Sequence, residues 1–211
     1  MEEIGDRTDD VARIASLDEL GRAIVGSETF ARFCVDHAAV LGEGNPRARL
    51  VLVGEAPGGQ EERAGHPFVG PAGQILGDAL GAVGVSRDQL WVTNVVKCRP
   101  TAPGIAGRVR NRAPTPDEVA WFLPWLHREL DLVAPRVIAC LGATAGNGVL
   151  GRTLRVTQER GQWFDGPAGV PTMVTFHPAF LLRRTVDRDE RYREFVADLH
   201  AAAVRAELVR A

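Results

Sequence analysis

Four short runs of apolar residues, rich in β-branched side chains, alternate along the chain with segments of helical periodicity. The runs are Leu50–Val53, Leu90–Val96, Val137–Leu141 and Thr172–Phe176. Nearly continuous apolar character is typical of strands that are covered on both faces, as in a parallel sheet. We therefore expect a central four-stranded, mainly parallel sheet.

Helical patterns fill the segments between and outside these strands. After the first run, the apolar residues that share one helical face are Ile75, Leu76, Ala79, Leu80 and Val83. Thr115-Pro116-Asp117-Glu118 has the pattern of a capping box with proline at the first helical position, which predicts a helix ending near Val133. Outer helices are expected within Leu17–Val40 and from about Glu190 to Val209. This alternation predicts an α/β protein, a three-layer αβα sandwich.

Length and composition are those of an ordinary globular protein. The chain has 211 residues, of which 45% are hydrophobic. This predicts one domain over residues 1–211, with a helical N-terminal extension of about 1–45 and a core of about 46–205. No apolar run approaches the roughly 20 residues that a membrane span needs. The N-terminal sequence is acidic and polar, unlike a secretory signal. We expect a cytoplasmic monomer with no membrane partner.

Charge and cysteine content exclude several classes of protein. The formal net charge of −2 argues against a broadly basic nucleic-acid-binding surface, although a local basic site stays open. The three cysteines, Cys34, Cys98 and Cys140, form neither a CxxC pair nor a zinc-site spacing. An odd number of cysteines in a cytosolic protein predicts reduced thiols.

Unusual polar sequences follow all four predicted strands. They are GEAPG (Gly54–Gly58), TNVVKCRP (Thr93–Pro100), LGATA (Leu141–Ala145) and HPAFLLR (His177–Arg183). Ligands of open α/β sheets bind beyond the carboxyl ends of the strands, so these sequences predict a shared site. GEAPG lacks both glycine patterns of nucleotide phosphate loops, and the acidic pair Glu61-Glu62 would repel a pyrophosphate. Its glycines would instead let the backbone approach a small ligand closely.

Three residues at these strand ends each have a structural and a functional interpretation. Phe68 is either a core residue or a ring that stacks on a planar ligand. Asn94 is either a structural amide or a donor–acceptor pair that reads the edge of a base. His177 either braces the sheet or donates a hydrogen bond to an oxygen that gains negative charge.

The segment Arg99–Pro114 is predicted to be a long irregular loop, rich in proline, glycine and arginine. Five basic residues and no acid lie between Lys97 and Arg112. The segment is either a solvated loop or a contact for a polyanion such as the DNA backbone.

Together these motifs resemble the uracil-DNA glycosylase superfamily, and most closely its family 4. The resemblance spans about Gly42 to Leu199 and rests on GEAPGGQEERAGHPFVGPAG, WVTNVVKCRP, LGATA and HPAFLLR in that order. It implies a uracil-DNA glycosylase-like fold and a DNA repair enzyme that flips uracil, or another deaminated base, out of DNA and hydrolyses its N-glycosidic bond.

The resemblance also implies residue roles. The catalytic residues would be Glu61, His177 and Glu55. The substrate-binding residues would be Gly54, Ala56, Pro57, Gly58, Phe68 and Asn94. Phe68 would stack on uracil, and Asn94 would form hydrogen bonds with the Watson–Crick edge of the base. The DNA backbone would be contacted by Lys97, Arg108, Arg110, Arg112 and Arg183.

One departure from family 4 concerns its four-iron four-sulfur (4Fe–4S) cluster, which needs four cysteines. Only Cys98 matches a ligand position, while Ser27, Phe30 and Phe122 stand where the other three ligands would be. We expect no iron–sulfur cluster and no other metal or cofactor. Aromatic packing around Trp121, Phe122 and Trp125 would take the place of the cluster.

A second departure concerns the reaction. A related branch that traps uracil-DNA covalently carries a nucleophilic histidine where this chain has Asn111, so we expect turnover by water. Lys97 is the only lysine, which argues against a Schiff-base lyase step, since that step needs an amine nucleophile, and predicts a monofunctional glycosylase. Two alternatives stay open: a protein that binds deaminated bases with little or no catalysis, and a small-molecule nucleotide-binding enzyme.

Overall fold

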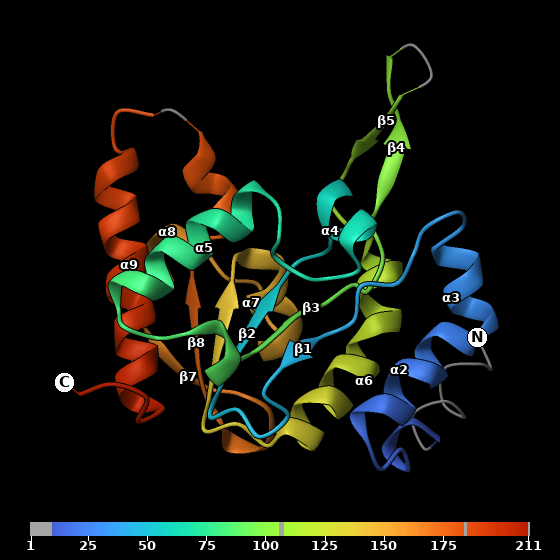
Figure 1. Cartoon of the computed structure of the whole chain (residues 1–211), viewed down its shortest axis with the longest axis horizontal. Coiled ribbons are helices and arrows are strands. Elements are labelled where there is room, and N and C mark those ends of the chain that lie inside the picture. The colour runs from blue at the N-terminus through green and yellow to red at the C-terminus, as the bar shows by residue number, and fades with distance from the viewer. Residues whose placement is uncertain (1–9, 106–107, 184, 211) are drawn as a thin grey trace.

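A six-stranded sheet forms the centre of the molecule in the computed structural model, which describes residues 10–105, 108–183 and 185–210. The strand order is β1 (Glu43–Gly44), β3 (Trp91–Asn94), β2 (Leu50–Gly54), β6 (Val137–Leu141), β8 (Pro171–Thr175) and β7 (Trp163–Asp165). The four inner strands are parallel, and the two edge strands are antiparallel (Figure 1). The four predicted strands are confirmed. The edge strands have two and three residues, too few for a recognisable alternation.

Helices cover both faces of this sheet, which confirms the three-layer sandwich. One face carries α5 (Pro71–Ala82) and α9 (Arg188–Arg205), and the other carries α6 (Pro116–Val133) and α7 (Ala143–Leu150). Alternate residues of β2 enter the two cores, with Leu50 and Leu52 on the α5–α9 side and Val51 and Val53 on the α6–α7 side. Both faces of the sheet are therefore dry, as the continuous apolar runs predicted.

The remaining short helices lie in the connections. They are α4 (Gly59–Ala64), α8 (Val156–Glu159), and the 3₁₀ turns η1 (Arg87–Gln89), η3 (Pro167–Gly169) and η4 (Pro178–Leu182). Within the described residues, no helix is long and apolar enough to cross a membrane.

Helix α6 begins at the predicted capping box. Thr115 Oγ1 accepts from the Glu118 N–H at 3.2 Å, and Glu118 Oε2 accepts from the Thr115 N–H at 2.7 Å. The helix ends after Val133 because Ala134 has a φ of 50°, the left-handed conformation common at helix ends.

The predicted N-terminal helix is two helices, α2 (Leu17–Gly26) and α3 (Glu28–Phe33). The break falls at Ser27, which has an extended conformation and whose Oγ accepts from the Phe30 N–H at 3.0 Å. A serine with this hydrogen bond caps a new helix, so the chain changes direction here. Helix α2 packs on α6, outside the main sandwich.

The segment predicted to be irregular contains a β-hairpin. Strands β4 (Thr101–Pro103) and β5 (Val109–Asn111) pair antiparallel and project from the body above α4 (Figure 1). We call residues 99–105 and 108–112 the β4–β5 arm. Its strands are three residues long and hold no alternation of apolar and polar side chains, so periodicity did not reveal them.

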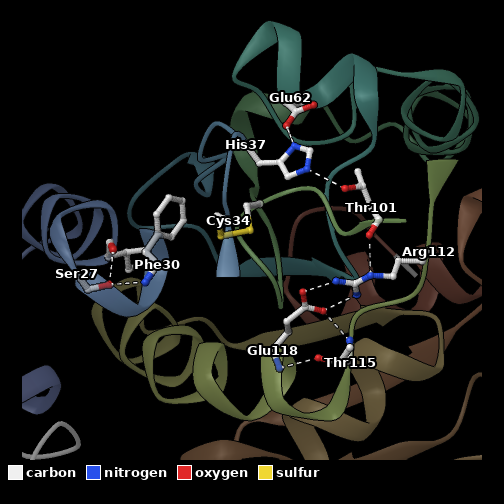
Figure 2. The surroundings of a disulfide bond; sticks show 11 residues. Ser27, Phe30, Cys34, His37, Glu62, Thr101, Arg112, Thr115 and Glu118 are labelled. Carbon is white, nitrogen blue, oxygen red and sulfur yellow. Dashed lines mark hydrogen bonds and ion pairs between the residues drawn. A yellow bond between two sulfur atoms is a disulfide. The ribbon is translucent and has the colours of Figure 1, made fainter. Parts of the chain in front are cut away.

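The prediction of reduced thiols is wrong for two of the three cysteines. Cys34 and Cys98 form a disulfide, with their Cα atoms 5.8 Å apart (Figure 2). Helix α3 ends at Phe33, so Cys34 follows it beside the chain that leaves β3, and this places the two cysteine side chains within bridging distance. Their separation of 64 residues carries no sequence signal of that contact. Cys140 is a free cysteine in β6, and burial raises the pKa of its thiol far above the usual range.

Candidate active site at the strand ends

A cavity of about 410 Å³ lies beyond the carboxyl ends of the inner strands. Among the predicted site residues, those that line it are Glu55, Ala56, Pro57, Gly58, Glu61, Phe68, Asn94, Arg112 and His177. Gly54 lies directly behind the wall, because a Cβ on it would stand 2.3 Å from Asn94 Oδ1 and 2.4 Å from Phe68 Cζ. A glycine is required there for the Asn94 amide and the Phe68 ring to approach the backbone this closely. The structure therefore brings the predicted substrate-binding set together.

Asn94 presents an unpaired acceptor to this cavity. Its side chain is 2% exposed, and Oδ1 has no hydrogen-bond partner among the described residues. A buried polar atom without a partner costs roughly 1–3 kcal/mol, so an unpaired amide oxygen in a cavity wall indicates a ligand position.

Phe68 forms one side of the cavity in a strained backbone conformation. Its φ of 53° is rare for a bulky residue. The Arg87 guanidinium donates to the Phe68 carbonyl at 3.0 Å, and a Cβ on Gly73 would stand 1.8 Å from that same oxygen. The ring lies 6.1 Å from the His177 ring at an angle of 35°. The loop and α5 together hold this aromatic face against the cavity.

Two carboxylates lie on the same wall and have different partners. Glu61, in the first turn of α4, accepts from the Gly70 N–H through Oε1 at 2.8 Å. No described residue donates to its Oε2. Glu55 follows β2 directly, and its Oε2 accepts from the Thr144 hydroxyl at the start of α7. Each carboxylate is held through one oxygen, and among the described residues no donor reaches the other.

His177 follows β8, where HPAFLLR begins. Its Nδ1 accepts a hydrogen bond from the Ala179 N–H at 3.1 Å, so the ring proton is on Nε2. Desolvation by burial lowers the pKa of the imidazole, and the charges of Glu55 and Glu61 oppose that effect in part. The ring is neutral near pH 7 and offers one N–H donor.

One predicted DNA contact is corrected by the structure. Lys97 is only 1% exposed, and its Nζ donates to Thr93 Oγ1 at 2.6 Å, to the Asn94 carbonyl at 2.7 Å and to Glu129 Oε2 at 2.5 Å. All three N–H groups are used inside the protein, so Lys97 does not reach DNA. Instead it ties the end of β3, which carries Asn94, to α6.

The predicted arginine contacts separate into two kinds. Arg112 forms a two-pronged ion pair with Glu118, at 2.6 Å for each prong, so its charge is largely compensated. This bond lowers the pKa of Glu118. Arg108, Arg110 and Arg183 are exposed and form no ion pair with any described residue.

A larger hollow of about 800 Å³ lies between α2 and the β1–β3 edge. Its floor is the Lys97–Glu129 pair, and the Trp91 indole N–H donates to Glu129 at 2.9 Å. These polar groups are all satisfied within the protein. Its buried polar groups are therefore paired, in contrast to Asn94 Oδ1 at the strand-end cavity.

The residues at the expected cluster position do not fit a 4Fe–4S cluster. Cys98 is bonded to Cys34, and Ser27 Oγ is occupied in capping α3. Phe30 and Phe122 are buried and pack edge to face, with ring centroids 6.3 Å apart. Among the described residues, no group of three or more histidine, cysteine or acidic side chains could hold a metal ion. The expected aromatic packing is present at this corner, where Trp121 contacts both Phe122 and Trp125.

Three residues at the cavity were not among the predicted site residues, although Asn111 was noted as the counterpart of a nucleophilic histidine. Asn111 lines the cavity, and its Oδ1 accepts from Arg99 Nε at 2.7 Å. Leu182 lines the cavity from η4 and is 44% exposed. The hydroxyl of Thr144 fixes Glu55. The place of Leu182 within HPAFLLR, directly after a predicted strand end, was the sequence signal that could have been used.

The chain is similar in sequence to known proteins of one superfamily. A family model described as the uracil DNA glycosylase superfamily matches residues 41–200. A type-4 uracil-DNA glycosylase of Thermotoga maritima is 39% identical over 75% of this chain and 78% of its own length. The type-4 uracil-DNA glycosylase of Archaeoglobus fulgidus is 35% identical over 85% of this chain and 90% of its own length. Among solved structures, Pedobacter heparinus SMUG2 matches at 13% identity with a TM-score of 0.48, over 74% of this chain and 76% of that chain.

Proposed function

Because this chain belongs to the uracil-DNA glycosylase superfamily, we propose that the strand-end cavity takes a uracil flipped out of DNA and that the enzyme hydrolyses its N-glycosidic bond. The reaction leaves free uracil and an abasic site, the first step of base excision repair. Flipping costs a few kcal/mol of lost stacking and pairing, and a close-fitting cavity with an aromatic wall offsets that cost.

The unpaired Asn94 Oδ1 is the observation that carries the proposal. Uracil has an N3–H donor between two carbonyl acceptors, whereas cytosine has an acceptor at N3. An amide oxygen accepts from N3–H, and the amide NH₂ of the same side chain donates to the O4 carbonyl. The Phe68 ring beside it supplies a stacking face for the pyrimidine.

Bond cleavage places positive charge on the deoxyribose and negative charge on the departing uracil. His177 Nε2–H donates to the O2 oxygen of uracil as that oxygen gains charge. Glu61 Oε2 faces the sugar side, where a carboxylate stabilises the cation and orients the attacking water. Glu55 has the same chemistry available, held by Thr144 from the other side.

Arg108, Arg110 and Arg183 are the proposed phosphate contacts, since each is exposed and carries an uncompensated charge. Two further parts of the proposal, a monomer and a cytoplasmic location, rest on the sequence alone. Gel filtration with light scattering and cell fractionation would check them.

The proposed enzyme works without an iron–sulfur cluster, in keeping with Phe30 and Phe122 at ligand positions and with the engagement of Cys98 in a disulfide. The purified protein is then colourless, with iron and sulfide near zero per chain. A brown protein with visible absorbance that chelation or acid removes would contradict this part of the proposal.

A base-release panel tests the activity. Duplex and single-stranded oligonucleotides that contain uracil, hypoxanthine, xanthine or a thymine mismatch are incubated with the enzyme, and free base is measured by chromatography. We expect uracil release with multiple turnovers and no covalent adduct on a denaturing gel. Tight binding of uracil-DNA with no base released would instead make the protein a binder of deaminated bases.

A further inference from the structure

The β4–β5 arm projects further from the body than any other labelled element (Figure 1). Its base lies beside the candidate active site, because Pro100 and Arg112 line the cavity. Asn111, at its base, lines the cavity. At its far end, Ile105 is 92% exposed, the second most exposed of the large apolar residues that the structure describes. An exposed apolar side chain adds little to the packing of the fold, and several of them together on one projection are typical of a contact with another molecule.

Four connections fix the base of the arm to the body. Thr101 Oγ1 hydrogen-bonds to His37 Nε2 at 2.9 Å, and His37 in turn bonds to Glu62 of α4 (Figure 2). Arg112 pairs with Glu118 at the start of α6, and the Arg112 Nε donates to the Thr101 carbonyl at 2.9 Å.

The third and fourth connections come from the chain that leads into the arm. Arg99 Nη1 pairs with Glu62 Oε2 of α4 at 3.3 Å, and the disulfide holds Cys98 immediately before the arm. Because the base is fixed on two sides, the arm holds a defined direction from the cavity outward.

The arm has an apolar face on the cavity side. Thr101 pairs with Asn111 and Pro103 with Val109 in the β4–β5 register, and alternate residues of a strand share a face. Pro103 and Val109 therefore continue outward from Asn111, and Val109 is 57% exposed. Together with Ile105 they form what we call the apolar strip: Pro103, Ile105 and Val109.

The charge around the strip is of one sign. Arg108 and Arg110 are exposed, form no ion pair with any described residue, and no acid occurs between Arg99 and Arg112. A partner with apolar surface next to dense negative charge matches this combination. DNA that has lost a base from its stack has both, since the neighbouring bases expose their faces between phosphates.

We propose that the β4–β5 arm is a second DNA-binding element, with the apolar strip against the bases or sugars next to the flipped nucleotide and Arg108 and Arg110 on the flanking phosphates. This inference rests on the proposed function, since the arm is placed by the cavity that takes the flipped base. The strip supplies contacts that do not depend on salt, and the two arginines supply contacts that do.

Salt titrations of DNA binding distinguish the contribution of the apolar strip from that of Arg108 and Arg110. Fluorescence anisotropy is measured on a labelled duplex that contains a stable abasic-site analogue, with wild type, I105S/V109S and R108Q/R110Q. The matched control is Val25→Ser, because Val25 is 48% exposed on α2, away from the cavity and the arm. Thermal unfolding of each variant checks that these surface changes leave the fold intact.

We expect I105S/V109S to bind at least tenfold more weakly at every salt concentration, with an unchanged slope of log affinity against log salt. R108Q/R110Q should lower the magnitude of that slope by about 1.8, which is two phosphate contacts at roughly 0.9 each. Val25→Ser should bind like wild type. Wild-type affinity in I105S/V109S, or an unchanged slope in R108Q/R110Q, would overturn the proposal.

The same variants separate this inference from the proposed function. If wild type releases no uracil while I105S/V109S still loses affinity, the proposed glycosylase activity fails and the arm stands as a DNA contact. If wild type releases uracil and the arm variants bind and react like it, the activity stands and the arm proposal fails. A 2-aminopurine base beside the lesion adds a readout, because its fluorescence should change less with I105S/V109S than with wild type.

Discussion

The strand-end cavity and the N-terminal corner both adjoin the chain that leaves β3. They differ in whether their polar groups have partners within the protein. We define the corner by Phe30, Cys34, Cys98 and Phe122, where α3 and α6 meet that chain. In the corner the sulfur atoms are bonded to each other and the rings pack edge to face. In the cavity, Asn94 Oδ1 and one oxygen of Glu61 have no partner among the described residues.

Under the proposed function, this difference separates residues that bind the ligand from residues that stabilise the fold. A group whose hydrogen bonds are satisfied inside the protein stabilises the fold and has little left for a ligand. The cavity keeps its unpaired atoms at a cost in stability, and the disulfide and aromatic rings of the corner offset part of that cost. Variants in the two regions should therefore affect different measurements.

Asn94→Ala should have the largest effect on activity. It removes both the acceptor for N3–H and the donor for O4, so kcat/KM on uracil-DNA should fall by about 10²–10³, as for loss of a hydrogen bond that forms in the transition state. The thermal unfolding temperature should change little, because Asn94 Oδ1 has no hydrogen-bond partner among the described residues to lose. Single-turnover uracil release and a melting curve measure the two effects.

Asn147→Ala is the matched control for that change. Asn147 Oδ1 accepts from the Leu154 N–H at 2.8 Å, so its amide is used for folding. Its loss should lower stability by about 1 kcal/mol and leave uracil release unchanged. If Asn94→Ala stayed within tenfold of wild-type activity, the assignment of the recognition amide would be wrong.

Replacing both Cys34 and Cys98 by serine should give the opposite pattern. The disulfide closes a loop of about 64 residues, and losing that constraint should cost about 4 kcal/mol of unfolding free energy. Uracil release well below the melting temperature should keep most of its rate, since neither sulfur lines the cavity. Urea denaturation with and without reductant measures the cost.

Cys140→Ala is the control, because this buried thiol is in no disulfide. Reductant should lower the stability of wild type and of Cys140→Ala equally, and should leave the double serine variant unaffected. Titration of three reactive thiols in unfolded, unreduced wild type, in place of one, would show that the bridge does not form.

Acid should affect the cavity before it affects the corner. The pKa of His177 is lowered by burial, so the neutral ring persists below the usual value of about 6.5. Protonation of Nδ1 at lower pH breaks the hydrogen bond from the Ala179 N–H, and uracil release should then fall by about tenfold per pH unit. Because the unfolded chain binds this proton more readily, stability should rise with pH between the folded-state and the unfolded-state pKa.

A pH profile of kcat/KM with His177→Gln as control checks this. Glutamine keeps an N–H donor and does not titrate, so the acid limb should flatten. An acid limb of equal steepness in His177→Gln would assign the titration to another group.

The cavity was largely predictable from the sequence because each part of it is encoded locally. GEAPG, Asn94 and HPAFLLR each directly follow or end a continuous apolar strand, and a parallel sheet brings such positions to one edge. No contact between distant residues had to be known. The four inner strands and the start of α6 were predictable for the same reason.

The corner and the arm depend on contacts that are distant in the sequence. Nothing near Cys34 indicates that α3 ends beside Cys98, so the thiols were predicted to be reduced. Lys97 was placed on DNA because basic neighbours follow it, whereas its partner Glu129 comes from α6, 32 residues later. A buried ion pair of this kind is recognised only when the packing of α6 on β3 is known.

Thr115→Ala should have the smallest effect. It tests the capping box, the local sequence signal that predicts the start of α6, the helix that carries Phe122 of the corner. Thr115 caps α6, the helix that carries Phe122, so its loss should cost about 1 kcal/mol in unfolding free energy. Thr115→Ser keeps the capping oxygen and should remain within a few tenths of a kcal/mol of wild type. Neither change should alter uracil release, because Thr115 does not line the cavity. A loss of activity in Thr115→Ala without loss of stability would mean that the start of α6 positions the arm through Glu118 and Arg112, and that the corner and the cavity are coupled there.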